Sequence, residues 1–199
     1  MANPAGDTAS EEPTPSREDE PGARRLRAVV EWVVVVAVAL GAALLVKTFI
    51  LGTFYIPSAS MEPTLMVGDR VFVNKLSYDV HSIHRGDVVV FTLPPGESAG
   101  PGIDDLIKRV IGLPGDTISS GPNGQILIDG HPISQPWASF SLGTGPAIAP
   151  FHVPAGDYFL MGDNRGDSRD SRYFGPIPGK LIIGRAFVRI WPINRIGLL

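Results

Sequence analysis

The longest apolar stretch of the chain runs from Trp32 to Val46 without interruption. Glu31 is the only charge between Arg27 and Lys47, and the 19 residues between these two cations just reach the length that crosses a bilayer core. A stretch of this length needs a helix there, because a helix satisfies its own backbone hydrogen bonds in lipid. We therefore expect one transmembrane helix over residues 28–47.

The charges that flank this stretch predict its orientation. Only Lys47 follows it closely, whereas three cations precede it: Arg24, Arg25 and Arg27. Because positive residues stay on the cytoplasmic side, we expect a single-pass protein of the cell membrane, with a cytoplasmic amino terminus and all later residues outside. A cleaved secretory signal has a similar design and stays open as an alternative, although the apolar stretch is long for a signal core.

After the span, the pattern changes to short β-type runs that Gly and Pro interrupt. The runs read RVFV, DVVVFTL, LIKRVIG, QILID, DYFLMG and LIIGRAFVRIW. Asp129-Gly130 follows QILI and favours a tight hairpin turn, whereas residues 141–156 have the composition of a loop. We expect a mainly β domain over residues 53–199, either barrel-like or built of packed sheets.

Composition narrows the possible functions. Residues 1–22 hold several acidic side chains and prolines but no aromatic residue, which predicts a disordered cytoplasmic tail. The net charge of -3 and the scattered Lys and Arg residues argue against a nucleic-acid partner. The chain has no cysteine, and its 4 histidines lack the spacing of metal ligands. We expect neither a metal nor a cofactor.

Two polar features stand out from the β pattern. The stretch IPSASMEPT, residues 56–64, places serines between two prolines, which does not suit a strand. Lys108 lies within an apolar run, on the same face as Leu106 and Val110 by alternation. Desolvation there would lower the pKa of the lysine and give a neutral amine able to activate a serine. On these residues alone, an edge-strand lysine and a serine-rich turn or helix cap are the preferred explanations.

Five short sequence motifs, or boxes, that occur in a fixed order favour the catalytic interpretation over the structural ones. They are PSASMEPT (57–64), GD (68–69), RGDVVVF (85–91), IKRVIGLPGD (107–116) and MGDNRGDSRDSR (161–172). Together they resemble the signature of bacterial type I signal peptidases, from about Phe54 to Arg185, with a membrane anchor upstream. The resemblance implies a membrane-bound serine endopeptidase with a Ser-Lys dyad. Its partners would be exported precursor proteins, from which it removes the amino-terminal signal peptide, and the lipid bilayer.

The same resemblance implies roles for individual residues. Ser60 matches the nucleophile and Lys108 the general base. Ser58 matches a hydroxyl that donates to the oxyanion together with the backbone N–H of Ser60. Family members prefer small residues at the first and third positions before the cut, and bind that segment in extended form. The residues that match the walls of these pockets are Phe54, Ile56 and Ile107.

The last box implies a supporting set. Ser168 matches a serine that orients the lysine amine by hydrogen bonding. Asp170 and Arg172 match an ion pair beside the site, with Arg109 nearby, and an aspartate is expected to balance cations that a lysine base tolerates poorly. The spacing of the box is preserved. The chain departs from one familiar form of the box at Gly166, Asp167 and Arg169. The added charges of Asp167 and Arg169 leave the local pKa values open.

Two rival functions use the same features. A membrane-anchored β domain that binds without catalysis would retain the span and the strands, but an inactive relative would be expected to lose Ser60 or Lys108. A self-cleaving repressor of the Ser-Lys type would need an amino-terminal DNA-binding domain, where this chain has an acidic tail and an apolar span. The signal peptidase interpretation accounts both for the apolar span and for the presence of Ser60 and Lys108.

Overall fold

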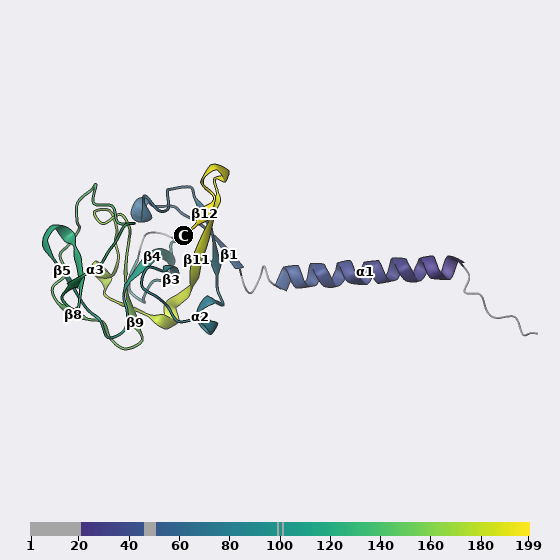
Figure 1. Cartoon of the computed structure of the whole chain (residues 1–199), viewed down its shortest axis with the longest axis horizontal. Helices are drawn as coiled ribbons and strands as arrows, with labels where there is room; N and C mark the ends of the chain where they lie inside the picture. Colours follow the sequence, from purple (N-terminus) through teal and green to yellow (C-terminus); the bar gives the residue numbers. More distant parts are fainter. Residues whose placement is uncertain (1–20, 46–50, 99, 101) are drawn as a thin grey trace, which may run out of the picture. The chain divides into compact units, whose positions relative to one another are not determined.

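The computed structural model describes residues 21–45, 51–98, 100 and 102–199. These form two units that divide at Leu44, an amino-terminal helical unit and a β unit. Helix α1 extends over Pro21–Leu45, and its segment Arg25–Leu44 is long and apolar enough to cross a membrane (Figure 1). Because α1 begins at Pro21, the last two residues of the predicted tail belong to the helix. Residues 1–20 and the predicted helix end at 46–47 lie outside the described residues.

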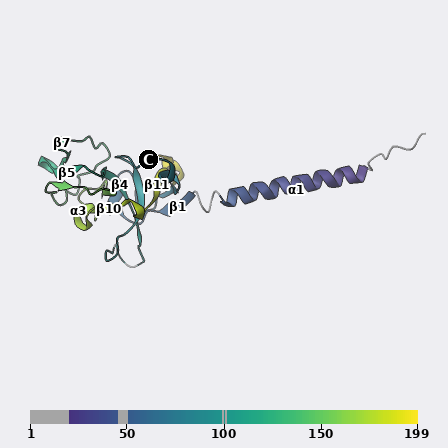
Figure 2. The same cartoon turned by 90° about the horizontal axis from the view of Figure 1, so that it is seen from below.

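The β unit contains two antiparallel sheets. The larger one has the strand order β1 (Leu51–Tyr55), β2 (Arg70–Asn74), β11 (Ile182–Trp191), β3 (Val88–Thr92), β4 (Asp105–Gly112), β9 (Asp157–Met161) and β10 (Ile177–Pro178), and β12 (Gly197–Leu198) pairs with β11. The smaller one has the order β7 (His131–Pro132), β6 (Ile126–Ile128), β5 (Thr117–Ser120) and β8 (Phe151–His152). Within the β unit, β5 lies at the end away from β1 in both views (Figure 1 and Figure 2). The mainly β prediction is confirmed.

Helical segments in the β unit are short. The α-helical turns are α2 (Ser77–Val80) and α3 (Ser171–Phe174). The 3-10 turns are η2 (Ala59–Met61), η3 (Pro122–Gly124), η4 (Gly179–Leu181) and η5 (Ile193–Arg195). The serine stretch therefore forms a helical turn between β1 and β2, in agreement with the unsuitability of its prolines for a strand.

The local turn prediction is confirmed and the loop prediction needs a correction. Asp129 and Gly130 connect β6 to β7 with φ values of 51° and 79°, as a tight primed turn requires. The segment 141–156 is not entirely loop, since β8 lies within it and pairs with β5 through His152 and Thr117. This strand is only two residues long, too short for alternation to show it in the sequence.

Strands β3 and β4 separate two apolar cores. Val88–Phe91 are all buried, because both faces of β3 are covered. On one face Val90 packs with Ile56 and Met61 in a first core, against which Ile107 of β4 packs. On the other face Leu106 and Val110 of β4 join a second core. Lys108 thus shares the face of Leu106 and Val110, as alternation predicts.

Candidate active site

Ser60 lies in a turn that many contacts hold in place. It belongs to η2, which Ser58 precedes as the N-cap residue. Met61, the next residue, is fully buried in the first core and its carbonyl oxygen accepts from the N–H of Leu65 at 2.9 Å. Ile56 fixes the other side of the turn, since its N–H donates to Asp69 at 3.0 Å and its carbonyl accepts from Gly68 at 2.9 Å. The hydroxyl of Ser60 is therefore positioned by the core beneath it.

Lys108 meets this hydroxyl from β4. Its Nζ donates to Ser60 Oγ over 2.6 Å, although the two residues are separated by 48 positions in the chain. The lysine is 2% exposed. Burial lowers its pKa from 10.5 to about 8, against the opposing attraction of Asp170 and Asp163. A useful fraction of this amine is therefore neutral near physiological pH, which surface lysines do not achieve.

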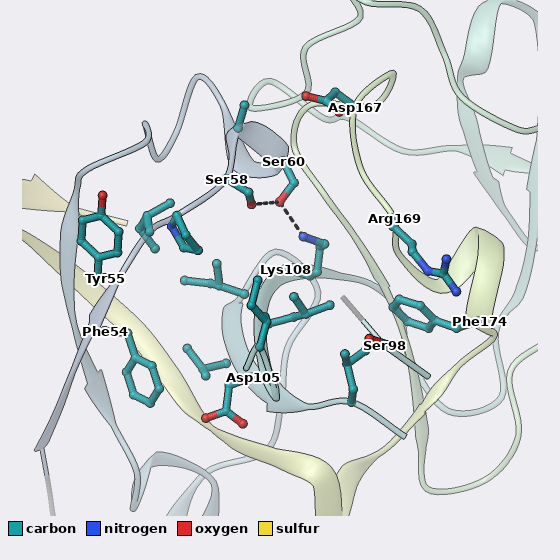
Figure 3. A pocket seen from close by; sticks show the side chains of 18 residues that line it. Phe54, Tyr55, Ser58, Ser60, Ser98, Asp105, Lys108, Asp167, Arg169 and Phe174 are labelled. Carbon is teal, nitrogen blue, oxygen red and sulfur yellow. Dashed lines mark hydrogen bonds between the residues drawn. The ribbon is translucent and has the colours of Figure 1, made fainter. Parts of the chain in front are cut away.

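Ser58 brings a second hydroxyl group to this point. Its Oγ lies 3.3 Å from Ser60 Oγ, within hydrogen-bonding distance (Figure 3). It lines the same pocket as Ser60 and Lys108. The Ser58 hydroxyl can thus donate a hydrogen bond to an atom that is in contact with Ser60 Oγ.

The segment after β9 packs directly on the serine turn. Asn164 donates from its main-chain N–H to Ser60 O at 3.1 Å, and from its side-chain amide to Ala59 O at 3.2 Å. Gly162 approaches so closely that a Cβ there would overlap Ser168 Oγ and Ser60 O. The segment consequently fixes the backbone of the turn, and a side chain at position 162 is sterically excluded.

Two buried ion pairs flank the lysine. Arg172 and Asp170 share two hydrogen bonds of 2.8 Å, Nε to Oδ1 and Nη2 to Oδ2. Arg109 and Asp163 share a similar pair, at 2.9 and 2.7 Å. In both pairs each side chain is almost fully buried. The cationic neighbours of Lys108 are thus neutralised, and each aspartate acts to raise the pKa of the lysine, partly offsetting the effect of burial.

The structure differs in part from the expected arrangement of the last box. Ser168 Oγ donates to Asp170 Oδ2 at 2.7 Å, and the hydrogen bond recorded for Lys108 among the described residues goes to Ser60 instead. Asp170 also accepts from Gly162 N at 2.9 Å. Ser168 is therefore linked to the ion pair next to the lysine. Its hydroxyl oxygen retains lone pairs able to accept from an ammonium group.

The three departures of this box, two of them charged, take different positions. Arg169 is exposed and forms an ion pair with Glu97 at 2.7 Å. Asp167 is also exposed, and it raises the pKa of Lys108 less than Asp170 and Asp163 do. Gly166 contributes close packing against Leu142 rather than charge. The departures from the familiar box leave the buried pairs intact.

A pocket opens beside Ser60 and Lys108. Its walls include Phe54, Ile56 and Ile107, the residues expected to contact substrate. Figure 3 places Phe54 and Tyr55 on one side of Lys108, and Arg169 and Phe174 on the other. The structure thus brings together the expected nucleophile, base and pocket residues from β1, η2 and β4.

The comparison with known proteins decides the family. A family model described as "Signal peptidase, peptidase S26" matches residues 29–191. The chain belongs to this signal peptidase family. The signal peptidase I of Leptolyngbya laminosa is 39% identical over 200 residues, which cover 96% of this chain and 95% of that protein. The expected family and the expected class, serine endopeptidase, are confirmed.

Two other relatives are also similar to this chain over most of their length. A probable signal peptidase I-2 of Synechocystis sp. is 40% identical over 156 residues, 77% of this chain and 69% of that one. The signal peptidase IB of Staphylococcus aureus is 34% identical over 182 residues, 83% of this chain and 91% of that one. A solved signal peptidase I of Enterococcus faecalis matches with a TM-score of 0.44 and 27% identity over 53% of this chain and 97% of that one. The family assignment rests on the sequence relatives.

Some site residues of this signal peptidase were missed by sequence reasoning. Asp163, Asn164 and Gly162 lie within the last box, but only Ser168, Asp170 and Arg172 were given roles there. Arg109 was expected near the Asp170–Arg172 ion pair, but no partner was predicted for it, and in the structure it pairs with Asp163. The run GDN itself carries no signal of its burial, because aspartate and asparagine are mostly exposed in proteins.

Proposed function

We propose that this chain is a membrane-anchored serine endopeptidase that removes signal peptides from exported precursor proteins, with Ser60 as nucleophile and Lys108 as general base. The contact of 2.6 Å between Lys108 Nζ and Ser60 Oγ carries the proposal, together with the lowered pKa of the lysine. A serine hydroxyl is a weak nucleophile at neutral pH, and a neutral amine at this distance can accept its proton.

The first half of the reaction forms an ester on Ser60. Ser60 Oγ attacks the carbonyl carbon of the scissile peptide bond while Lys108 Nζ takes the hydroxyl proton. The negative charge on the carbonyl oxygen is stabilised by the Ser58 hydroxyl and the Ser60 N–H, which are fixed before the charge develops. The resulting Lys108 ammonium donates its proton to the leaving amine, and the C–N bond breaks.

The second half restores the enzyme. A water molecule gives its proton to the neutral Lys108 and attacks the ester carbonyl. The ester C–O bond then breaks, and the ammonium returns a proton to Ser60 Oγ. Ser168, Asp170 and Arg172 act as positioning residues, because Ser168 and Arg172 both bind Asp170, whose charge favours the ammonium form of Lys108 during each proton transfer.

The location follows from the helix and its flanking charges. We assign residues 28–47 as the membrane span, residues 1–22 as a cytoplasmic tail and residues 53–199 as the extracytoplasmic peptidase domain. The arginines before the span support this orientation. Ser60 follows the span closely in the chain, and a signal peptide that still crosses the bilayer would present its cleavage site on the same side.

The test is the cleavage of a purified precursor by the full chain in detergent. Wild-type protein and Ser60→Ala are compared at equal concentration, and the product is sized and its new amino terminus sequenced. We expect the wild type to cut once, after a small residue, and Ser60→Ala to leave the precursor intact. If both proteins are folded and neither cuts, the domain binds without catalysis and the proposal fails.

A further inference from the structure

The pocket extends past the residues that the family resemblance names. On the side of Lys108 away from Phe54, Figure 3 shows Phe174, Arg169 and Ser98. Beyond the residues expected to contact substrate, the lining includes a set that we call the second wall: Leu93, Ser98, Ile103, Leu106, Arg169 and Phe174. Most of them are apolar and come from the β3–β4 connection, β4 and α3. The pocket therefore has two walls that differ in composition and origin.

Residues 105–108 of β4 line the pocket, and one edge of this segment has no partner strand among the described residues. β3 pairs with β4 from Asp105 to Arg109, whereas β9 pairs with β4 only from Arg109 to Gly112. Within the described residues, the other edge of residues 105–108 thus lacks a paired strand. An extended peptide can add to such an edge, and its side chains then alternate between the two faces of the sheet.

Alternation assigns the peptide side chains to the walls. Ile107 lies on the face of the first core, with Phe54 and Ile56. Leu106 lies on the opposite face and packs with the second core, as does Phe174. If the first and third side chains before the cut point toward Ile107, the second must point toward Leu106. The second side chain before the cut would then point away from the pockets for the first and third side chains and contact the residues of the second wall.

We propose that Ile103, Leu106 and Phe174 form a subsite for the second residue before the cut, and that this subsite selects an apolar side chain of about leucine size. Phe174 is held there by Phe91 of the second core, with ring centroids 6.3 Å apart. Arg169 lies at the rim, where Glu97 compensates its charge, and the acidic residues Asp105 and Asp167 also line the pocket. The inference rests on the proposed function, because it requires the peptide to lie on β4 with its scissile bond at Ser60.

The experiment measures kcat/KM of the full chain in detergent on three matched peptides. Each has alanine at the first and third positions before the cut, and the second position is alanine, leucine or lysine. We expect leucine to exceed alanine by about tenfold, as for a few methylene groups entering an apolar pocket. Ile103→Ala and Phe174→Ala should reduce this ratio toward one. Tyr173→Ala should keep it, since Tyr173 is an exposed neighbour that does not line the pocket.

Arg169→Ala provides the second readout. It should leave the leucine ratio unchanged, because Arg169 lies at the rim and the apolar side chains form the subsite. The lysine peptide should not exceed the alanine peptide, since Ile103, Leu106 and Phe174 offer its ammonium group no hydrogen-bond partner. Equal rates for leucine and alanine in the wild type would overturn the subsite, as would a leucine ratio that persists in both Ile103→Ala and Phe174→Ala. Failure of the wild type to cut even the alanine peptide and a precursor would instead overturn the proposed function. The two failures are therefore distinct.

Discussion

The main-chain N–H of Asn164 donates a hydrogen bond to the carbonyl oxygen of Ser60 over 3.1 Å. The side-chain amide of the same residue donates to Ala59 O, so that one asparagine holds two successive carbonyl groups of the serine turn. These contacts join two segments that lie 104 positions apart in the chain. The orientation of the Ser60 N–H, which we propose as part of the oxyanion site, depends on this link.

Asn164→Ala tests the link. The main-chain contact is retained and the contact to Ala59 is lost, which costs about 1 kcal/mol of stability. We expect kcat to fall about tenfold with KM little changed, because the turn positions groups used in the transition state. Steady-state kinetics and thermal melting of the purified variant check this. A proportional rise in KM with unchanged kcat would contradict the assigned role.

Gly162→Ala tests the close approach of the last box. The added methyl group would overlap the Ser60 carbonyl oxygen, which belongs to the backbone and cannot move aside as a flexible side chain can. We expect loss of activity and a lower melting temperature. Gly197→Ala is the matched control, since its Cβ would meet only Arg195 O at 4.0 Å. Equal activity in the two variants would show that position 162 tolerates a side chain.

The buried Arg109–Asp163 pair should contribute far more to stability than the exposed Arg169–Glu97 pair. Arg109→Met leaves a buried carboxylate without its cation, which typically costs about 3–5 kcal/mol of unfolding free energy. Arg169→Met removes a solvent-exposed pair and should cost at most about 1 kcal/mol. Denaturant unfolding of both variants measures the difference. Similar losses would mean that the first pair is hydrated in solution.

The buried amine of Lys108 should lower the unfolding free energy of the protein. Its pKa is 10.5 in an unfolded chain and about 8 when folded, so the unfolded state binds the proton more tightly. The resulting penalty, about 3 kcal/mol, is fully present below pH 8 and disappears as the pH rises toward 10.5. Lys108→Met should therefore raise the unfolding free energy at pH 7 by about 1–3 kcal/mol while abolishing cleavage. Lys180→Met, at an exposed position, should change neither; a destabilised Lys108→Met would contradict the sign.

Much of the fold could be predicted because it follows from local pattern. Alternation in DLIKRVIG gave both the strand and the face of Lys108, and Asp129-Gly130 gave the β6–β7 turn. The short strands β7, β8 and β10 were not predictable, since two residues carry no period. Pairing with a neighbouring strand, rather than their own sequence, makes them strands.

The site could be predicted only through its motifs. Nothing local connects Ser60 to Lys108, and the ordered boxes supplied that connection. The partner of Arg109 was not predictable, because Asp163 and Asp170 lie in the same box and the choice depends on the path of the backbone after β9. The pairing of Arg169 with Glu97 joins two loops whose distance is set by tertiary structure alone.

The most direct test of the Ser60–Lys108 mechanism is the pH dependence of kcat/KM for wild type and Lys108→Arg on one peptide. We expect the wild-type value to rise about tenfold per pH unit below pH 8 and to level off above it, because only the neutral amine can accept the Ser60 proton. Lys108→Arg should be inactive at every pH, since a guanidinium group stays protonated. A flat wild-type profile between about pH 6 and 9, or measurable activity of Lys108→Arg, would contradict the mechanism.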